Sequence, residues 1–444
     1  MSQVASSVKD ELERFLDRLW DAAVAFGLDP VPVDFEIVPA HAIYELAAYG
    51  MPGHYSHWIY GRDYWRMKRR MDSGQGRLYE MVIDTDPAVA YLLDSNTVAA
   101  QKLVMAHVLG HADVFKNHLL LKDGPKQFHH TLAASRERFA QYAQEYGADA
   151  VEAVLDRALS IQDQVSAITP RPEPQPRPQA PSPYVDLWGA EAAPPRRRVP
   201  RYALPTPDLL GFLARESPIL QPWERDILEV VRLEGLYHAP KRRVKILHEG
   251  WATYCHHHLL ELMELSSGEA IEVSRVHAQV ATPDPLRLNP YWFGWQFAES
   301  LVEEYGFKAA RAIWMEETDA GLVRNYLDQE RMRRLELYRY RWVPGEVRTP
   351  RGPLPTWDAV YEETEVEALR SALANALAAG PPEIQVVDVT PSGVLELRHT
   401  PDDSLLDPEW TQLTLEAIRD LWGGGVVLYD GNAKPYRVEP RRRG

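Results

Sequence analysis

Two histidines spaced four positions apart, His107 and His111, are the clearest chemical signal in the sequence. The flanking residues, AAQKLVMA before and ADVFKNHLLL after, are typical of a helix. Residues i and i+4 lie on one helix face a turn apart, so these two imidazoles can bind one metal ion together. The pair alone is not specific, because histidines also occur at this spacing as packing residues.

A third metal ligand is available in the segment HEGWATY at 248–254, which is predicted to open another helix. Glu249 would complete a set of two histidines and one glutamate, a common catalytic zinc pattern that leaves one position open to water. The sequence therefore predicts a divalent metal at His107, His111 and Glu249, with zinc as the first choice.

Further histidines follow Glu249 and could enlarge the ligand set. His256 lies seven residues later, about two helical turns, and therefore on nearly the same face as Glu249. His277 belongs to a separate segment. If either residue is an extra ligand, the site would suit iron or manganese as well as zinc. The alternative is that the histidine run at 256–258 partly faces solvent.

The general base that hydrolysis requires is not evident. In the zinc-protease motif a glutamate directly follows the first histidine, but Val108 occupies that position here. Another carboxylate would have to accept the proton, and the candidates are Glu45, Glu80 and Asp113. The sequence alone does not place any of these three beside the metal ligands.

A segment rich in aromatic residues and glycine, 50–65, is predicted to be loop-like and to contribute to substrate binding. Its side chains His54, His57 and Arg62 are of the type that loops bring to binding sites. The aromatic residues of the segment are expected instead to pack the loop onto the core.

The elements expected to position these residues are mainly helices. Apolar periodicity predicts helices over 8–27, 87–121 with a break near 93–96, 131–166, 207–265 and 289–340. Extended segments are predicted at 31–38 and 78–84. Towards the end, strands are predicted at 383–389, 394–400, 425–431 and 436–440, with helices at about 364–379 and 408–421.

These elements indicate a mainly α (α+β) protein of two domains. The main domain, over 8–345, is expected to be helical and zincin-like. It carries a proline-rich insertion at 168–203, whose composition is typical of an extended loop or linker. A small α+β domain is expected over 350–440.

Composition excludes several other classes of protein. With 49 basic and 64 acidic residues the formal charge is −15, which argues against a nucleic-acid partner. One cysteine permits no intrachain disulfide and fits a reducing compartment. The sequence shows no secretory signal and no apolar stretch of the roughly 20 residues that a transmembrane segment needs. A cytoplasmic location is therefore expected.

Several motifs resemble, in order and approximate spacing, those of the stage V sporulation protein R (SpoVR) family. They are YELAAYGMPGHYSHWIYG at 44–61, YEMVIDTDPAVAYLLDSNT at 79–97, QKLVMAHVLGHADVFKNH at 101–118, ILHEGWATYCHH at 246–257 and LNPYWFGW at 288–295. The resemblance covers about 9–345. It implies an association with formation of the spore cortex, a modified peptidoglycan, although related proteins also occur in bacteria that do not sporulate.

The resemblance also carries individual residues. His107 and His111 match the family's histidine helix, Glu249 its Glu-Gly-Trp-Ala motif, and His256 and His277 two later histidines.

This sequence departs from the family pattern at two positions. His248 and His118 each stand where the resemblance leads us to expect an asparagine. If those asparagines orient ligands in relatives, the ligand surroundings differ here.

Two functions fit these observations. The first is a metal-dependent hydrolase that acts on a peptide or peptidoglycan-related bond, which the open site of two histidines and one glutamate favours. The alternative is a non-catalytic sporulation or stress assembly factor with a structural or vestigial metal site, which Val108 favours. The partner would be an unidentified protein or cell-wall precursor in either case.

Overall fold

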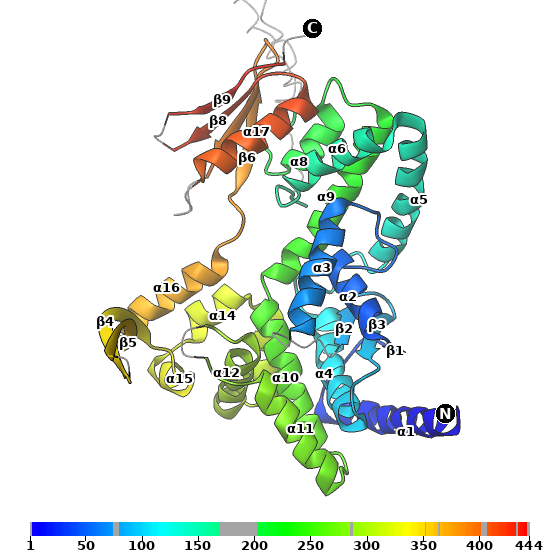
Figure 1. Ribbon diagram of the computed structural model, residues 1–444, viewed down its shortest axis with the longest axis vertical. Helices are drawn as coiled ribbons and strands as arrows, with labels where there is room; N and C mark the ends of the chain where they lie inside the picture. Colours follow the sequence, from blue (N-terminus) through cyan, green and yellow to red (C-terminus); the bar gives the residue numbers. More distant parts are fainter. Residues whose placement is uncertain are drawn as a thin grey trace, which may run out of the picture. The chain divides into compact units, whose positions relative to one another are not determined.

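The computed structural model describes residues 2–73, 80–167, 202–284, 287–350, 352–362, 365–400, 406–431 and 434–441 (Figure 1). It is mainly helical with three small sheets, which confirms the expected mainly α (α+β) class. The chain forms two compact units: unit 1 contains 1–137 and 237–379, and unit 2 contains 138–236 and 380–444. Among the described residues, no helix combines the length and the apolarity that crossing a membrane would require.

Unit 1 is the larger and is built mainly from helices. Its helices are α1 (Ser2–Phe26), α2 (Ala40–Tyr49), α3 (Trp58–Asp72), α4 (Val98–Asn117), α10 (Lys245–Glu261), α11 (Ser267–Val280), α12 (Pro290–Tyr305), α13 (Phe307–Glu316), α14 (Asp319–Tyr326), α15 (Gln329–Arg334) and α16 (Val366–Ala378). The unit boundaries fall within α5 (Phe128–Tyr146) and α9 (Pro222–Arg242). The helices predicted from periodicity over 8–27, 207–265 and most of 289–340 are thereby confirmed.

The centre of unit 1 is the packing of α4 against α10. Helix α4 is buried along nearly its whole length. A Cβ at Gly110 would meet the Cα of Ala252 at 2.6 Å, so glycine lets the two backbones approach closely. Helix α12 crosses α10 in the same way, because a Cβ at Gly250 would meet the Cα of Gly294 at 2.4 Å.

A three-stranded sheet of unit 1 lies beside α4 in the order β1-β3-β2. Strands β1 (Val33–Val38) and β3 (Ala88–Leu93) are parallel, and β2 (Glu80–Ile83) pairs antiparallel with β3. The helix predicted to begin at 87 is therefore wrong over its first part. The apolar run AVAYLL is short enough to be buried as a central strand, and periodicity cannot separate that case from a helix.

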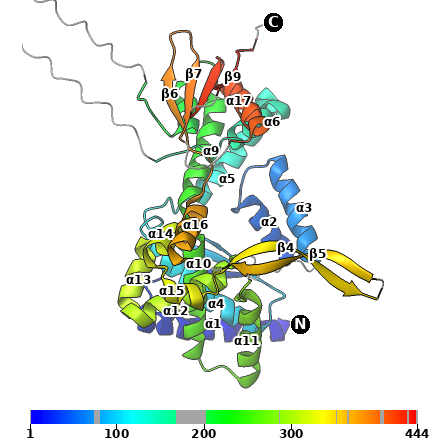
Figure 2. The ribbon, with the colours of Figure 1, turned by 90° about the vertical axis from the view of Figure 1, so that its left-hand side faces the viewer.

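Two other parts of unit 1 differ from prediction. The expected loop at 50–65 ends early, because α3 begins at Trp58 with the His57 side chain accepting a hydrogen bond from the backbone N–H of Ile59. The helix expected to reach 340 ends at Arg334. It is followed by a long hairpin of β4 (Arg339–Thr349) and β5 (Gly352–Glu362), which Figure 2 shows extending away from the helices around it.

Unit 2 combines helices with a four-stranded sheet. The strands are β6 (Ile384–Val389), β7 (Leu395–His399), β8 (Val426–Asp430) and β9 (Tyr436–Val438), in that order across the sheet, with β7 and β8 parallel. Helices α6 (Ala148–Leu159), α8 (Leu209–Glu216) and α17 (Pro408–Trp422) belong to the same unit. The four predicted C-terminal strands and the helix between them are confirmed.

The two compact units follow a different division from the predicted domains of 8–345 and 350–440. The C-terminal sheet shares its unit with helices from the middle of the chain. Because compactness does not show which parts fold independently, the predicted domain layout stays a prediction. Nearly all of the predicted insertion at 168–203 lies outside the described residues.

Candidate metal centre

A large cleft in unit 1, of about 1310 Å³, is lined by residues from α4, α10, β2 and the neighbouring helices. The metal ligands predicted from the sequence, His107, His111 and Glu249, all lie in its wall. The histidines come from α4 and the glutamate from the facing turn of α10. The close helix crossing at Gly110, between the two histidines, is what brings Glu249 opposite them.

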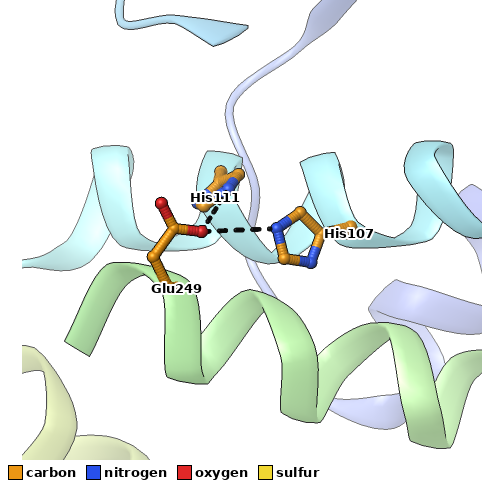
Figure 3. A group of neighbouring side chains, drawn as sticks. All are labelled: His107, His111 and Glu249. Carbon is orange, nitrogen blue, oxygen red and sulfur yellow. Dashed lines mark ion pairs between the residues drawn. The ribbon is translucent and has the colours of Figure 1, made fainter. Parts of the chain in front are cut away.

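The three side chains converge on one point (Figure 3). Glu249 Oε2 lies 3.6 Å from His107 Nε2 and 3.7 Å from His111 Nε2. The candidate ligand atoms all lie within 4.8 Å of one another. Zinc bonds of about 2.0–2.2 Å in a tetrahedral site separate ligand atoms by roughly 3.3–3.5 Å. Small side-chain rotations would therefore let all three atoms contact one ion.

The protonation of this group suits metal binding. Burial holds the pKa of His111 well below its usual value, and the neighbouring imidazoles act in the same direction. Burial would raise the pKa of Glu249, but His107 and His111 outweigh it and lower that pKa overall. The resulting neutral imidazole and ionised carboxylate are the forms that bind metal ions.

His256 and His277 lie beside these ligands and form a hydrogen-bonded chain with His107. The Nδ1 atoms of His107 and His256 are 3.0 Å apart, and His256 Nε2 lies 2.8 Å from His277 Nδ1. Both ring nitrogens of His256 are thus occupied by other imidazoles. The arrangement leaves His107 Nε2 directed at Glu249, without a hydrogen-bond partner among the described residues.

Glu80 is the one candidate base that the fold brings to the cleft. It is the first residue of β2 and lines the cleft with the three candidate ligands. Burial raises the pKa of Glu80, His107 opposes this, and the charge of Glu249 adds to the increase. A raised pKa makes a carboxylate a stronger proton acceptor, as a general base requires.

The other two candidate bases lie elsewhere. Glu45 is exposed on α2 and does not line the cleft. Asp113 is fully buried and also outside the cleft lining, and its carboxylate accepts hydrogen bonds from Trp251 Nε1 and from the guanidinium of Arg311. These partners make Asp113 a packing carboxylate rather than a proton acceptor.

The predicted substrate-binding residues are not in the cleft either. His54 is buried among tyrosines and its Nδ1 lies 3.1 Å from the carbonyl oxygen of Tyr55. His57 caps α3. Arg62 contacts Asp63 and lies over the ring of Trp58. None of the three lines the cleft, so the structure does not bring them to the candidate ligands.

Two residues of the site were not predicted as such. Tyr291, at the start of α12, lines the cleft, stacks on His107 with ring centroids 6.1 Å apart and donates a hydrogen bond to Glu249. Burial raises the pKa of Tyr291, and Glu249 adds to this, so the hydroxyl stays protonated. His248 stacks on His111 with ring centroids 4.4 Å apart. No spacing pattern marks Tyr291, which tertiary packing alone brings to the ligands, whereas His248 directly precedes Glu249 in the sequence.

Comparison with known proteins agrees with the arrangement of motifs. The family described as SpoVR like protein matches residues 7–380. The chain is 26% identical over 482 residues to the uncharacterized protein YcgB of Escherichia coli (strain K12), and the alignment covers 95% of this chain and 92% of that one. No solved structure matches the chain. Since the family match extends over most of the sequence and includes every residue of the candidate metal centre, the protein belongs to the SpoVR family.

Proposed function

We propose that the protein is a metal-dependent hydrolase whose ion, with zinc as the first choice and iron or manganese as alternatives, is held by His107, His111 and Glu249. The observation that carries this proposal is the convergence of three ligand atoms in the wall of an open cleft. Three protein ligands leave a further position for water, which is the pattern of catalytic rather than structural sites. When bound, the ion would polarise a substrate carbonyl and promote ionisation of water.

The remaining roles follow from the residues around the ligands. Glu80 takes the place of the missing glutamate after His107, accepting a proton from the attacking water and returning it to the leaving group. Val108 cannot accept the proton, because its side chain is a hydrocarbon and is fully buried in the hydrophobic core. Tyr291 holds the Glu249 carboxylate through its hydroxyl group. In this zincin-like scheme the proton acceptor is Glu80 instead of the glutamate that follows the first histidine in zinc proteases.

An edge strand in the wall of the cleft favours a peptide or peptidoglycan-related substrate. Strand β2 lines it and is the edge strand of its sheet, with β3 as its partner on one side. An edge strand presents backbone N–H and C=O groups that can pair with an extended peptide. A peptide bound along β2 would pass Glu80 and the candidate ligands.

The second candidate function is a non-catalytic factor in sporulation or stress assembly. Val108 favours it, since the usual catalytic glutamate is absent from the histidine helix. The family name associates such proteins with sporulation, and a role in spore cortex formation would be exercised through an unidentified protein or cell-wall-precursor partner. In this case the ion would have a structural role only.

Metal content tests the site itself. Protein purified without an affinity tag should contain about one zinc, iron or manganese per chain by elemental mass spectrometry, and His107→Ala/His111→Ala should contain none. His129→Ala/His130→Ala removes two histidines from α5, outside the cleft, and should retain the metal. Stoichiometric metal in the His107/His111 variant, or none in the parent even after reconstitution, would refute the proposed site.

Turnover separates the two functions. With an assay on peptide and peptidoglycan fragments, Glu80→Gln should lower turnover by about 10²–10⁴-fold, the usual contribution of a general base, without releasing the metal. Glu45→Gln changes an exposed glutamate outside the cleft and should leave turnover unchanged. Equal turnover in both variants would exclude Glu80 as the base. Absence of turnover in metal-loaded protein would favour the assembly function.

A further inference from the structure

The cleft wall carries positive charge that the candidate metal centre does not use. Arg70 of α3, Lys241 of α9 and Lys245 of α10 all line the cleft. Arg70 and Lys245 are exposed, and no carboxylate of the described residues lies within ion-pair distance of either. A chain with a formal charge of −15 gives no general reason for cations to gather at one cleft.

Asp84, the carboxylate paired with Lys241, does not fully neutralise the lysines beside it. Asp84 is buried and already shared by two lysines, with Lys126 Nζ at 2.5 Å and Lys241 Nζ at 3.1 Å. This group of three side chains therefore keeps one net positive charge. Lys241 is also held over the ring of Tyr237, 3.4 Å from its centroid, which fixes the charge at the cleft wall.

Lys245 forms no ion pair among the described residues, although the carboxylate of Asp319 attracts its charge from beyond ion-pair distance. The nearby Asp319 uses both oxygens to accept the backbone N–H groups of Ile246 and Leu247. Asp284 and Arg287, which also line the cleft, carry one charge of each sign. Among the described residues, Arg70 and Lys245 thus form no ion pair, while Lys241 shares the single charge of Asp84 with Lys126.

One residue of the cleft lining also has a buried hydrogen-bonding atom without a partner in the part of the chain that the structure describes. His248 Nε2 is buried and has no hydrogen-bond partner among the described residues, although the residue lines the cleft. Its ring lies one helical turn after Lys245 on α10 and interacts electrostatically with Lys241. A buried polar atom without a partner is costly unless a ligand or water satisfies it.

We infer that this part of the cleft is a subsite for an oxyanion group of the substrate, a carboxylate or a phosphate, bound by Arg70, Lys241 and Lys245 with His248 Nε2 as a further hydrogen-bonding partner. Guanidinium and ammonium groups are the side chains that bind such groups best. As a substrate subsite the inference rests on the proposed function, because the oxyanion would anchor a substrate whose scissile bond lies at the metal centre. Binding of the oxyanion itself does not require the metal.

Titration of metal-free protein with anions tests this directly. After removal of metal with a chelator, inorganic phosphate and succinate are titrated separately by isothermal calorimetry at low ionic strength. We expect saturable binding of at least one anion. The Arg70→Ala/Lys245→Ala variant should bind it at least about tenfold more weakly, which corresponds to about 1.4 kcal/mol. Binding of phosphate alone would indicate a phosphorylated substrate, and binding of succinate alone would indicate a carboxylated one.

The matched control is Arg69→Ala/Arg243→Ala. Both residues are exposed and neither lines the cleft, so this variant loses the same net charge from nearby positions. It should retain affinity within about twofold. No saturable binding of either anion to the parent, or equal weakening in the two variants, would overturn the subsite. Metal content of the Arg70/Lys245 variant should equal that of the parent, which keeps this test separate from that of the metal site.

Discussion

Helix α4 presents two polar faces that the protein treats in opposite ways. On one face, Lys102 and Asp113 are buried and fully paired: Lys102 contacts Glu11 and Glu269, while Asp113 is bound by several donors. On the other face, His107 and His111 are equally buried, yet His107 Nε2 and His111 Nδ1 have no hydrogen-bond partner among the described residues.

The difference distinguishes two kinds of buried polar group on a single helix, those that are paired and those that are not. Buried polar atoms are normally paired, and the first face follows this rule closely. The second face departs from it where a cleft reaches the helix and a carboxylate faces the two imidazoles. His107 Nε2 faces Glu249 without a hydrogen-bond partner among the described residues and is available as a ligand atom, whereas a packing face would pair it.

Removal of Asp113 should have the largest effect on stability. Asp113→Ala leaves the partly buried Arg311 guanidinium and Trp251 Nε1 without their acceptor, and breaking such a buried pair costs about 3–5 kcal/mol. Urea denaturation should show this loss, while the folded fraction still binds metal. Asp29→Ala breaks an exposed pair with Lys116 and should cost less than about 1 kcal/mol. A stable Asp113 variant that fails to bind metal would reverse the assignment of the two faces.

The close crossing of α4 and α10 at Gly110 should tolerate no added side-chain volume. In Gly110→Ala the new Cβ would meet the Cα of Ala252 at 2.6 Å, so the helices must separate, at a cost of about 1–3 kcal/mol. Metal affinity should fall as well, because Glu249 moves away from the histidines. Gly61→Ala is the matched control: nothing lies near its Cβ, and alanine in helix α3 should stabilise the protein by about 0.5–1 kcal/mol. Thermal unfolding of both variants should therefore shift in opposite directions.

Metal binding at the face of α4 that carries His107 and His111 should also depend on the neighbouring His256. His256→Ala removes the partner of His107 Nδ1, and loss of such an orienting contact lowers metal affinity about 10–100-fold. His257→Ala changes a neighbouring, half-buried histidine that does not line the cleft and should have little effect. Competition with a zinc-binding dye measures both. Unchanged affinity in the His256 variant would show that the imidazole chain does not orient the ligand.

Sequence patterns predicted one face of α4 better than the other. The spacing of His107 and His111 needs only local helix geometry, and their partner Glu249 follows from a known type of ligand set. The structure brings these three together. Asp113, in contrast, is a candidate base by sequence, because its partner Arg311 comes from a distant helix that no local pattern identifies.

Local patterns likewise decided which parts of the fold could be predicted. The amphipathic helices and the C-terminal strands follow from periodicity alone. The β4–β5 hairpin pairs neighbouring parts of the chain, with Thr349 opposite Gly352, and no predicted strand covers it. Strand β3 is predicted as a helix because its pairing with β1 and β2 is non-local. Tyr291 escapes sequence patterns for the same reason, because its contact with His107 is non-local.

The smallest expected effect is the pH dependence of stability that arises from the ion pair between Lys102 and Glu269. Lys102 and Ser266 lower the pKa of Glu269 to about 2, below its usual value of 4.5. A carboxyl group whose folded-state pKa is lowered stabilises the protein above pH 4.5, and this contribution is lost as the pH falls from 4.5 towards 2. Because water partly screens the pair, Glu269→Gln should cost about 1 kcal/mol at pH 7. Glutamine preserves the capping box of α11 with Ser266. The difference in urea midpoint between parent and variant should therefore shrink as the pH falls from 4.5 towards 2, whereas Glu264→Gln, at an exposed position, should follow the parent throughout. A constant difference across this range would mean that Glu269 contributes by packing rather than by charge.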